Sequence, residues 1–123
     1  MKRIFVICPV RNVSEQIKKT IGDYVLELER SGAKVHWPSR DTNQDDSVGL
    51  NICLENREAI YMADEVHIWF DSNSQGSLFD IGMTFAFIRE RNKKIVLINE
   101  KEILPTPHKS FQNLLLELAK APN

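Results

Sequence analysis

Four short apolar runs, separated by longer stretches of helical character, most constrain how this chain can fold. Continuous apolar runs of about five residues are typical of strands that are buried on both faces of a sheet. The runs occupy residues 4–8, 33–37, 66–70 and 94–98, and Pro9 and Pro38 directly follow the first two. Apolar residues recur at helical spacing over residues 14–30, 50–62, 77–91 and again from Phe111.

Strand and helix therefore alternate four times, which predicts right-handed βαβ units and a parallel sheet covered by helices on both faces. We expect an α/β fold, a flavodoxin-like or Rossmann-like three-layer sandwich with strand order 2-1-3-4. The sheet is expected to have four strands, or five if a small strand forms near Ile103. A length of 123 residues suffices for one domain with its own core, so residues 1–123 are interpreted as a single domain.

Charge and composition argue against several kinds of partner. The formal net charge is -1, which provides no basic surface of the kind that binds a nucleic acid polymer. No apolar run approaches the roughly 20 residues that a membrane span requires. The two cysteines, Cys8 and Cys53, form no CxxC pair and have no zinc-ligand spacing, which favours reduced, packed thiols in a cytoplasmic protein.

Polar residues follow the expected strands at the place where such sheets bind ligands. In an open parallel sheet the ligand lies beyond the carboxyl ends of the strands, where the strand order switches. With order 2-1-3-4 this switch lies between the first and third strands. The loops there are residues 9–12 and 71–76, and they supply Pro9, Arg11, Asn12 and Asp71 as candidate ligand contacts.

A second polar segment, residues 40–47, follows the second strand and is expected to form a loop over the same edge of the sheet. Arg40 and Asp41 could contact a base or a ribose there. The acidic residues could also hold a divalent cation, but their spacing matches no calcium loop, and we favour a solvated loop without metal.

The segment Ser74–Gly82 combines a turn, an expected helix start and a carboxylate. It directly follows the third apolar run and opens a helix that is apolar nearly all round. Backbone N–H groups at a helix start attract anions, so Ser74 and Gly76 could cradle a phosphate. Asp80 is expected in the first helical turn, where the helix dipole would keep it ionised. The alternative is structural: Ser77 and Asp80 also fit a capping box.

The motif Ser-x-Gly-x-x-x-Asp-x-Gly at Ser74–Gly82, preceded by Ala63-Asp64 before an apolar strand, resembles the nucleoside 2-deoxyribosyltransferase superfamily. That superfamily includes the deoxynucleoside monophosphate N-glycosidases. The resemblance implies cleavage or transfer at the N-glycosidic bond of a nucleoside or nucleotide, without a cofactor. It assigns to Asp80 the role of the family glutamate, which attacks or stabilises the anomeric carbon as the base leaves.

The same resemblance suggests roles for three further residues. Ser74 stands where the monophosphate hydrolases hold the phosphate, and Arg11 lies near the position of a family arginine. Glu58 is the nearest match to a second family acid, which would orient the substrate or protonate the leaving base. From the residues alone, Glu58 and Arg11 also fit ordinary surface charges.

Two further expectations complete the sequence-based interpretation. The apolar helix after Ser77 could pack against a second copy of the chain, so we expect a homodimer or larger oligomer, although a central buried helix would have the same composition. The alternative to an enzyme is a non-catalytic nucleotide-binding or sensing domain of the same fold. That alternative predicts binding of a nucleotide without release of the base.

Overall fold

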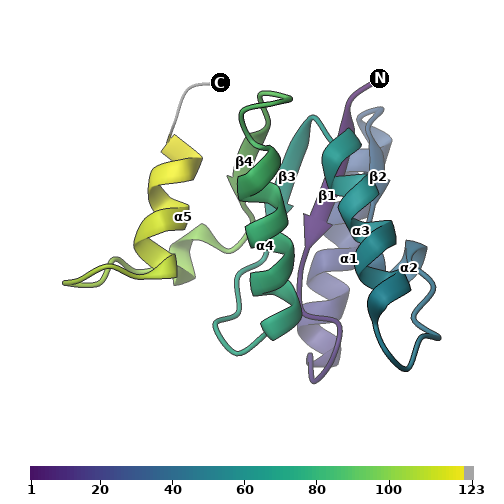
Figure 1. The fold of residues 1–123 in the computed structure, drawn as a ribbon, viewed down its shortest axis with the longest axis horizontal. Helices are drawn as coiled ribbons and strands as arrows, with labels where there is room; N and C mark the ends of the chain where they lie inside the picture. The colour runs from purple at the N-terminus through teal and green to yellow at the C-terminus, as the bar shows by residue number, and fades with distance from the viewer. Residues whose placement is uncertain (121–123) are drawn as a thin grey trace.

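The four apolar runs form one parallel sheet in the computed structural model, which describes residues 1–120 (Figure 1). The sheet has the order β2-β1-β3-β4, as predicted. Its strands are β1 (Arg3–Ile7), β2 (Lys34–His36), β3 (Glu65–Ile68) and β4 (Lys94–Leu97). The registers pair Phe5 with both His36 and Val66, so the carboxyl ends of the three strands meet at one edge of the sheet.

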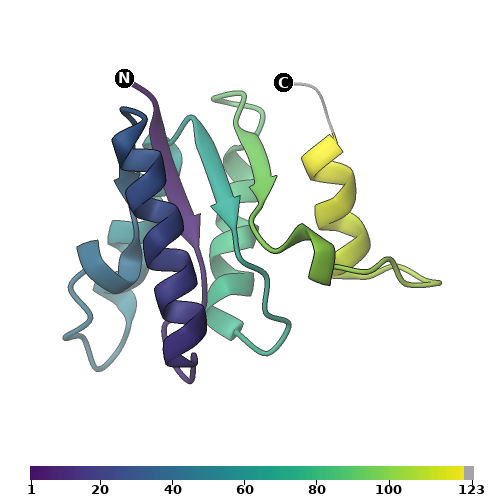
Figure 2. The same cartoon turned by 180° about the vertical axis from the view of Figure 1, so that it is seen from behind.

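Helices cover both faces of this sheet and so make the predicted three layers. Figure 1 shows α3 (Leu50–Met62) and α4 (Gln75–Phe87) in front of the sheet. Figure 2, the view from the other side, shows α1 (Glu15–Arg30) in front of the opposite face. Because side chains alternate along a strand, Phe5 and Ile7 pack under α3 and α4, whereas Val6 packs under α1. The last helix, α5 (Phe111–Lys120), lies beside β4.

Of the four to five strands predicted, the described residues form four, and no fifth strand forms near Ile103. The chain there forms a short 3-10 helix, η1 (Glu100–Glu102), and Ile103 is buried in the core without joining the sheet. The backbone N–H groups of Glu102 and Ile103 donate to the carbonyls of Asn99 and Glu100. These local bonds use the donors that a further strand would need.

The segment 40–47 is not wholly a loop, because a short helix, α2 (Pro38–Asp41), occupies its beginning. Pro38 stands at the first helical position, where a missing N–H costs nothing. The Asp41 carboxylate accepts the backbone N–H of Trp37 at 2.9 Å and so closes this single turn.

The helix that carries Asp80 begins and ends earlier than predicted. It begins at Gln75 with Ser74 as the N-cap, and it ends at Phe87. The Ser74 hydroxyl oxygen accepts the backbone N–H of Ser77 at 3.2 Å, and its hydroxyl group donates to Ser77 Oγ at 2.8 Å. Asp80 therefore lies in the second turn of α4, one turn farther from the helix start than expected. None of the helices in residues 1–120 has the length and apolar character of a membrane span.

Candidate functional site

Asp80 lies on the side of α4 that faces α3 and the end of β1. Its side chain is partly buried, with Asn56 as its hydrogen-bonding neighbour. Burial raises the pKa values of the thiols of Cys8, just after β1, and Cys53, on α3, and the charge of nearby Asp80 raises them further. The Asp80 carboxylate thus lies between α4, α3 and the residue that follows β1.

Burial raises the pKa of Asp80 to about 7, and the hydrogen bond from Asn56 only partly opposes this rise. The prediction of a permanently ionised carboxylate is therefore wrong. The helix dipole acts mainly within the first turn, which Asp80 does not reach, whereas burial always disfavours the charged form of an acid. Near neutral pH the side chain is divided between its acid and its carboxylate.

The capping alternative for Asp80 is also wrong. A capping box would need Ser77 as the N-cap and a bond from Asp80 back to the Ser77 backbone N–H. That N–H instead bonds to Ser74, and Ser77 is buried inside the helix. Within residues 1–120, the Asp80 carboxylate makes no hydrogen bond to its own helix, and Asn56 on α3 is the polar neighbour that helps to lower its pKa. The carboxylate is therefore not committed to holding its own helix.

Asn56 is the site residue that the sequence analysis missed. It is buried on α3, and its side-chain oxygen accepts the Thr42 hydroxyl at 2.8 Å. The same hydroxyl lies 2.8 Å from Nε2 of His36. The available signal was periodicity: positions 52, 56 and 60 share one helical face, so an asparagine stands between two isoleucines on the buried side.

Glu58 does not join this cluster. It is exposed, and it lies two residues from Asn56 along α3. At about 100° per residue, the two side chains leave the helix on nearly opposite sides. The structure therefore places Glu58, the predicted second acid, away from Asp80, and Asn56 is the residue of α3 that acts on that carboxylate.

The loop after β1 approaches Asp80 through Cys8. Cys8, Pro9, Trp37 and Ser39 line a small hollow of about 90 Å³. Burial raises the pKa of the Cys8 thiol to about 11, so the thiol stays protonated at neutral pH. Arg11 and Asn12 are exposed in this loop, and Asn12 adopts a left-handed backbone with φ of 56°.

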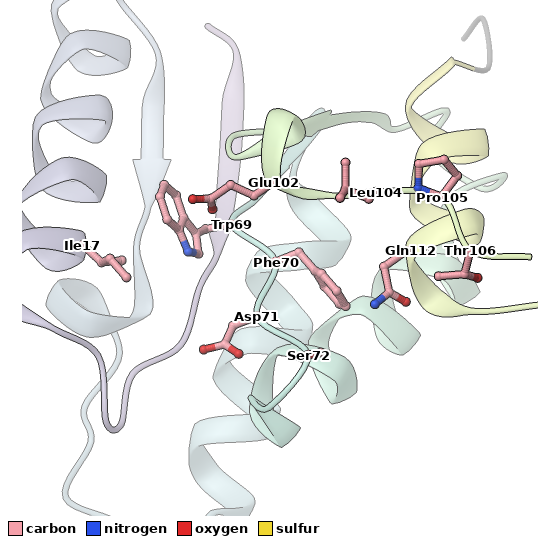
Figure 3. Close-up of a pocket in the computed structure, with 10 residues that line it drawn as sticks. All are labelled: Ile17, Trp69, Phe70, Asp71, Ser72, Glu102, Leu104, Pro105, Thr106 and Gln112. Atoms are coloured by element: carbon pink, nitrogen blue, oxygen red, sulfur yellow. The ribbon is translucent and has the colours of Figure 1, made fainter.

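Asp71 lies on a different, larger hollow of about 490 Å³ beside the end of β3 (Figure 3). Figure 3 shows Ile17 and Trp69 on one side of it, and Leu104, Thr106 and Gln112 on the other. The candidate ligand contacts predicted together thus separate into two groups, one near Cys8 and Asp80 and one around Asp71.

Arg40 and Asp41 are engaged with protein neighbours. The Arg40 guanidinium donates to both Glu29 oxygens at 3.0 and 2.9 Å, and to Asp41 at 2.8 Å. The Arg40 bond with Asp41 helps to lower the pKa of that carboxyl, against an opposing effect of burial. These contacts join α2 to α1. No group of three or more His, Cys, Asp or Glu side chains in residues 1–120 is arranged to hold a metal ion.

Ser74 and Gly76 both lie at the start of α4, but only the Ser74 side chain is hydrogen bonded there. The Ser74 hydroxyl is occupied by Ser77, as described above. Gly76 is exposed in the first turn, and nothing lies within 4 Å of the place where a Cβ would stand. The first N–H groups of α4 precede any intrahelical bond, so they remain the anion-binding feature of this segment.

Comparison with known proteins bears on both the fold and the site. No family model and no curated protein matches the sequence. Among solved structures, the fold is similar to that of the CMP N-glycosidase BcmB from Clostridium botulinum, with a TM-score of 0.61 and 25% sequence identity. The match covers 96% of this chain and 83% of that chain. It is consistent with a nucleoside 2-deoxyribosyltransferase-like fold.

Proposed function

We propose that this protein cleaves the N-glycosidic bond of a nucleoside or nucleoside monophosphate, with Asp80 as the carboxylate at the anomeric carbon. The observation that carries the proposal is a partly buried carboxylate, unused by its own helix, whose pKa burial raises to about 7. The similarity to a CMP N-glycosidase supports a reaction of this class.

The chemistry follows from the charge that develops in the sugar. As the bond between the anomeric carbon and the base nitrogen breaks, its electron pair leaves with the base and the sugar becomes oxocarbenium-like. Ionised Asp80 stabilises this positive charge or bonds to the anomeric carbon. Water then completes hydrolysis, or a second base completes transfer, and neither route needs a cofactor. Asn56 favours the ionised form of Asp80, because it lowers the pKa of that carboxyl.

A phosphorylated substrate would place its anion at the start of α4. Because the Ser74 hydroxyl is bonded to Ser77, the phosphate would be held by the free N–H groups of Gln75 and Gly76 instead. Exposed Arg11 could reach the same phosphate from the loop after β1. This arrangement favours a nucleoside monophosphate over a free nucleoside.

Incubation with a panel of ribo- and deoxyribonucleosides and their 5′-monophosphates tests the proposal, with free base measured by chromatography. We expect base release, faster from a monophosphate than from the matching nucleoside. Differential scanning fluorimetry with the same panel provides the second measurement. A nucleotide that raises the melting temperature while no member of the panel loses its base would instead support a non-catalytic nucleotide-binding domain.

We also propose that the outer side of α4 contacts a second copy of this chain. Phe79 and Phe85 on this helix are 57% and 53% exposed. Large exposed apolar side chains grouped on one element are typical of an interaction surface. We expect a dimer by sedimentation velocity at micromolar concentration, and a monomer for Phe79→Glu. The control is Phe111→Glu, because Phe111 is 54% exposed on α5. A monomeric parent protein contradicts the proposal.

A further inference from the structure

The hydroxyl of Thr42 connects His36 to Asn56 inside the protein. Thr42 and Asn56 are each 5% exposed, so water does not compete for these bonds. The hydroxyl donates to Asn56 Oδ1, and Nε2 of His36 lies 2.8 Å from the same oxygen atom. A threonine hydroxyl has one hydrogen, so when it donates to Asn56 it must accept from His36. His36 then carries a proton on Nε2.

This arrangement determines which way the Asn56 side chain faces. With its oxygen bonded to Thr42, its NH₂ group is the part that can donate to Asp80, the neighbour whose pKa Asn56 lowers. Hydrogen bonds therefore run from His36 to Thr42 and from Thr42 to Asn56, and they leave the Asn56 NH₂ group as the part of that side chain that can act on Asp80, whose pKa Asn56 lowers. The other titratable neighbours of Asp80 are the thiols of Cys8 and Cys53, which are weak donors.

We propose that Thr42 and His36 are positioning residues for Asp80, because they hold the Asn56 amide hydrogens toward its carboxylate. The consequence for catalysis rests on the proposed function, whereas the orientation of Asn56 does not. The segment after β2 thus supports the reactive carboxylate from within the protein. His36 is held in place by stacking on Phe5, with ring centroids 5.4 Å apart. The charged groups that act on His36 are Asp41, Glu55 and Arg40.

Replacing Thr42 by valine tests the proposal, because valine keeps the shape of threonine but cannot hydrogen bond. We expect the pKa of Asp80, followed by ¹³C NMR of its carboxyl, to rise by about one unit. With a parent pKa of about 7, the ionised fraction at about pH 7 then falls about fivefold, and kcat for base release falls with it. The kcat values of the parent protein and of Thr42→Val should converge near pH 9, whereas a loss of activity caused by a general structural defect would persist at that pH.

Two variants serve as controls. Thr84→Val removes another buried hydroxyl, which donates to the backbone carbonyl of Asp80 at 2.9 Å, and should leave the carboxyl pKa unchanged. Thr42→Ser keeps a hydroxyl and should restore the parent pKa. An unchanged pKa in Thr42→Val, or an equal rise in Thr84→Val, overturns the proposal. The NMR titration tests the positioning role of Thr42 even if the parent protein releases no base. Absence of base release would refute the proposed function but not the positioning role.

Discussion

Replacing Asp80 by asparagine is expected to abolish base release, with turnover reduced by at least about 10³-fold. The amide is almost the same size as the carboxylate and can still contact Asn56, but it carries no negative charge. It can neither bond to the anomeric carbon nor stabilise the developing oxocarbenium. Release of base from the best substrate of the panel, measured by chromatography at about pH 8, checks this expectation.

Two comparisons separate lost chemistry from lost structure. Asp23→Asn removes an exposed carboxylate on α1 that pairs with Lys19, and it should leave turnover unchanged. Asp80→Glu supplies the longer acid that the resemblance would place here, and it should retain measurable activity. If Asp80→Asn keeps more than about a tenth of the parent turnover, Asp80 is not the reacting carboxylate.

The strand order could be predicted because each strand contains its own signal. Residues 4–8 are continuously apolar, residues 66–70 are apolar except for His67, and in the structure Phe5, Val6, Val66 and Ile68 are buried. Handedness then leaves few ways to connect parallel strands through helices. The predicted helix 50–62 coincides with α3, because its apolar side chains recur every three or four residues.

The ends of α4 and the state of Asp80 could not be predicted, because both depend on distant parts of the chain. Ser74 and Ser77 are equally good caps in sequence. One contributor to the choice is Asn99, whose side chain bonds both backbone groups of Phe70 and fixes where the chain leaves β3. The pKa of Asp80 depends on how closely α3 packs, which no local pattern reports. The burial of Lys93 could not be predicted for the same reason. Its ammonium group donates to the carbonyls of Tyr61 and Ala63, which are distant in the sequence.

The stability gained by Asp80→Asn is expected to grow with pH, from near zero at about pH 4 to as much as about 4 kcal/mol at about pH 8. The pKa of Asp80 is about 7 in the folded protein, above its ordinary value of 3.8. A raised pKa in an acid means that the folded state favours the neutral form. The contribution of Asp80 to stability is therefore full below its ordinary pKa and is lost as the pH rises through about 7.

Urea unfolding of both proteins at about pH 4, 6 and 8 measures this difference directly. Burial also lowers the pKa values of His36 and His67, but both histidines are present in both proteins and cancel in the comparison. Asp46→Asn provides a control in which the change in the free energy of unfolding should have the opposite sign. The Asp46 carboxylate accepts the backbone N–H groups of Asn51 and Ile52 at the start of α3. Such backbone hydrogen bonds lower the pKa of Asp46, so loss of its carboxylate should destabilise the protein near neutral pH.

A carboxylate that weakens the fold at the pH where it is needed is expected to be kept for its chemistry. Asp80→Asn should therefore be inactive and, at about pH 8, more stable than the parent protein. A gain that is the same at about pH 4 and pH 8 would mean that the side chain is not desolvated, and the assignment of Asp80 as a tuned reactive group would then fail. A gain that grows between about pH 4 and about pH 7, together with lost turnover, would tie the raised pKa and the proposed reaction to one side chain.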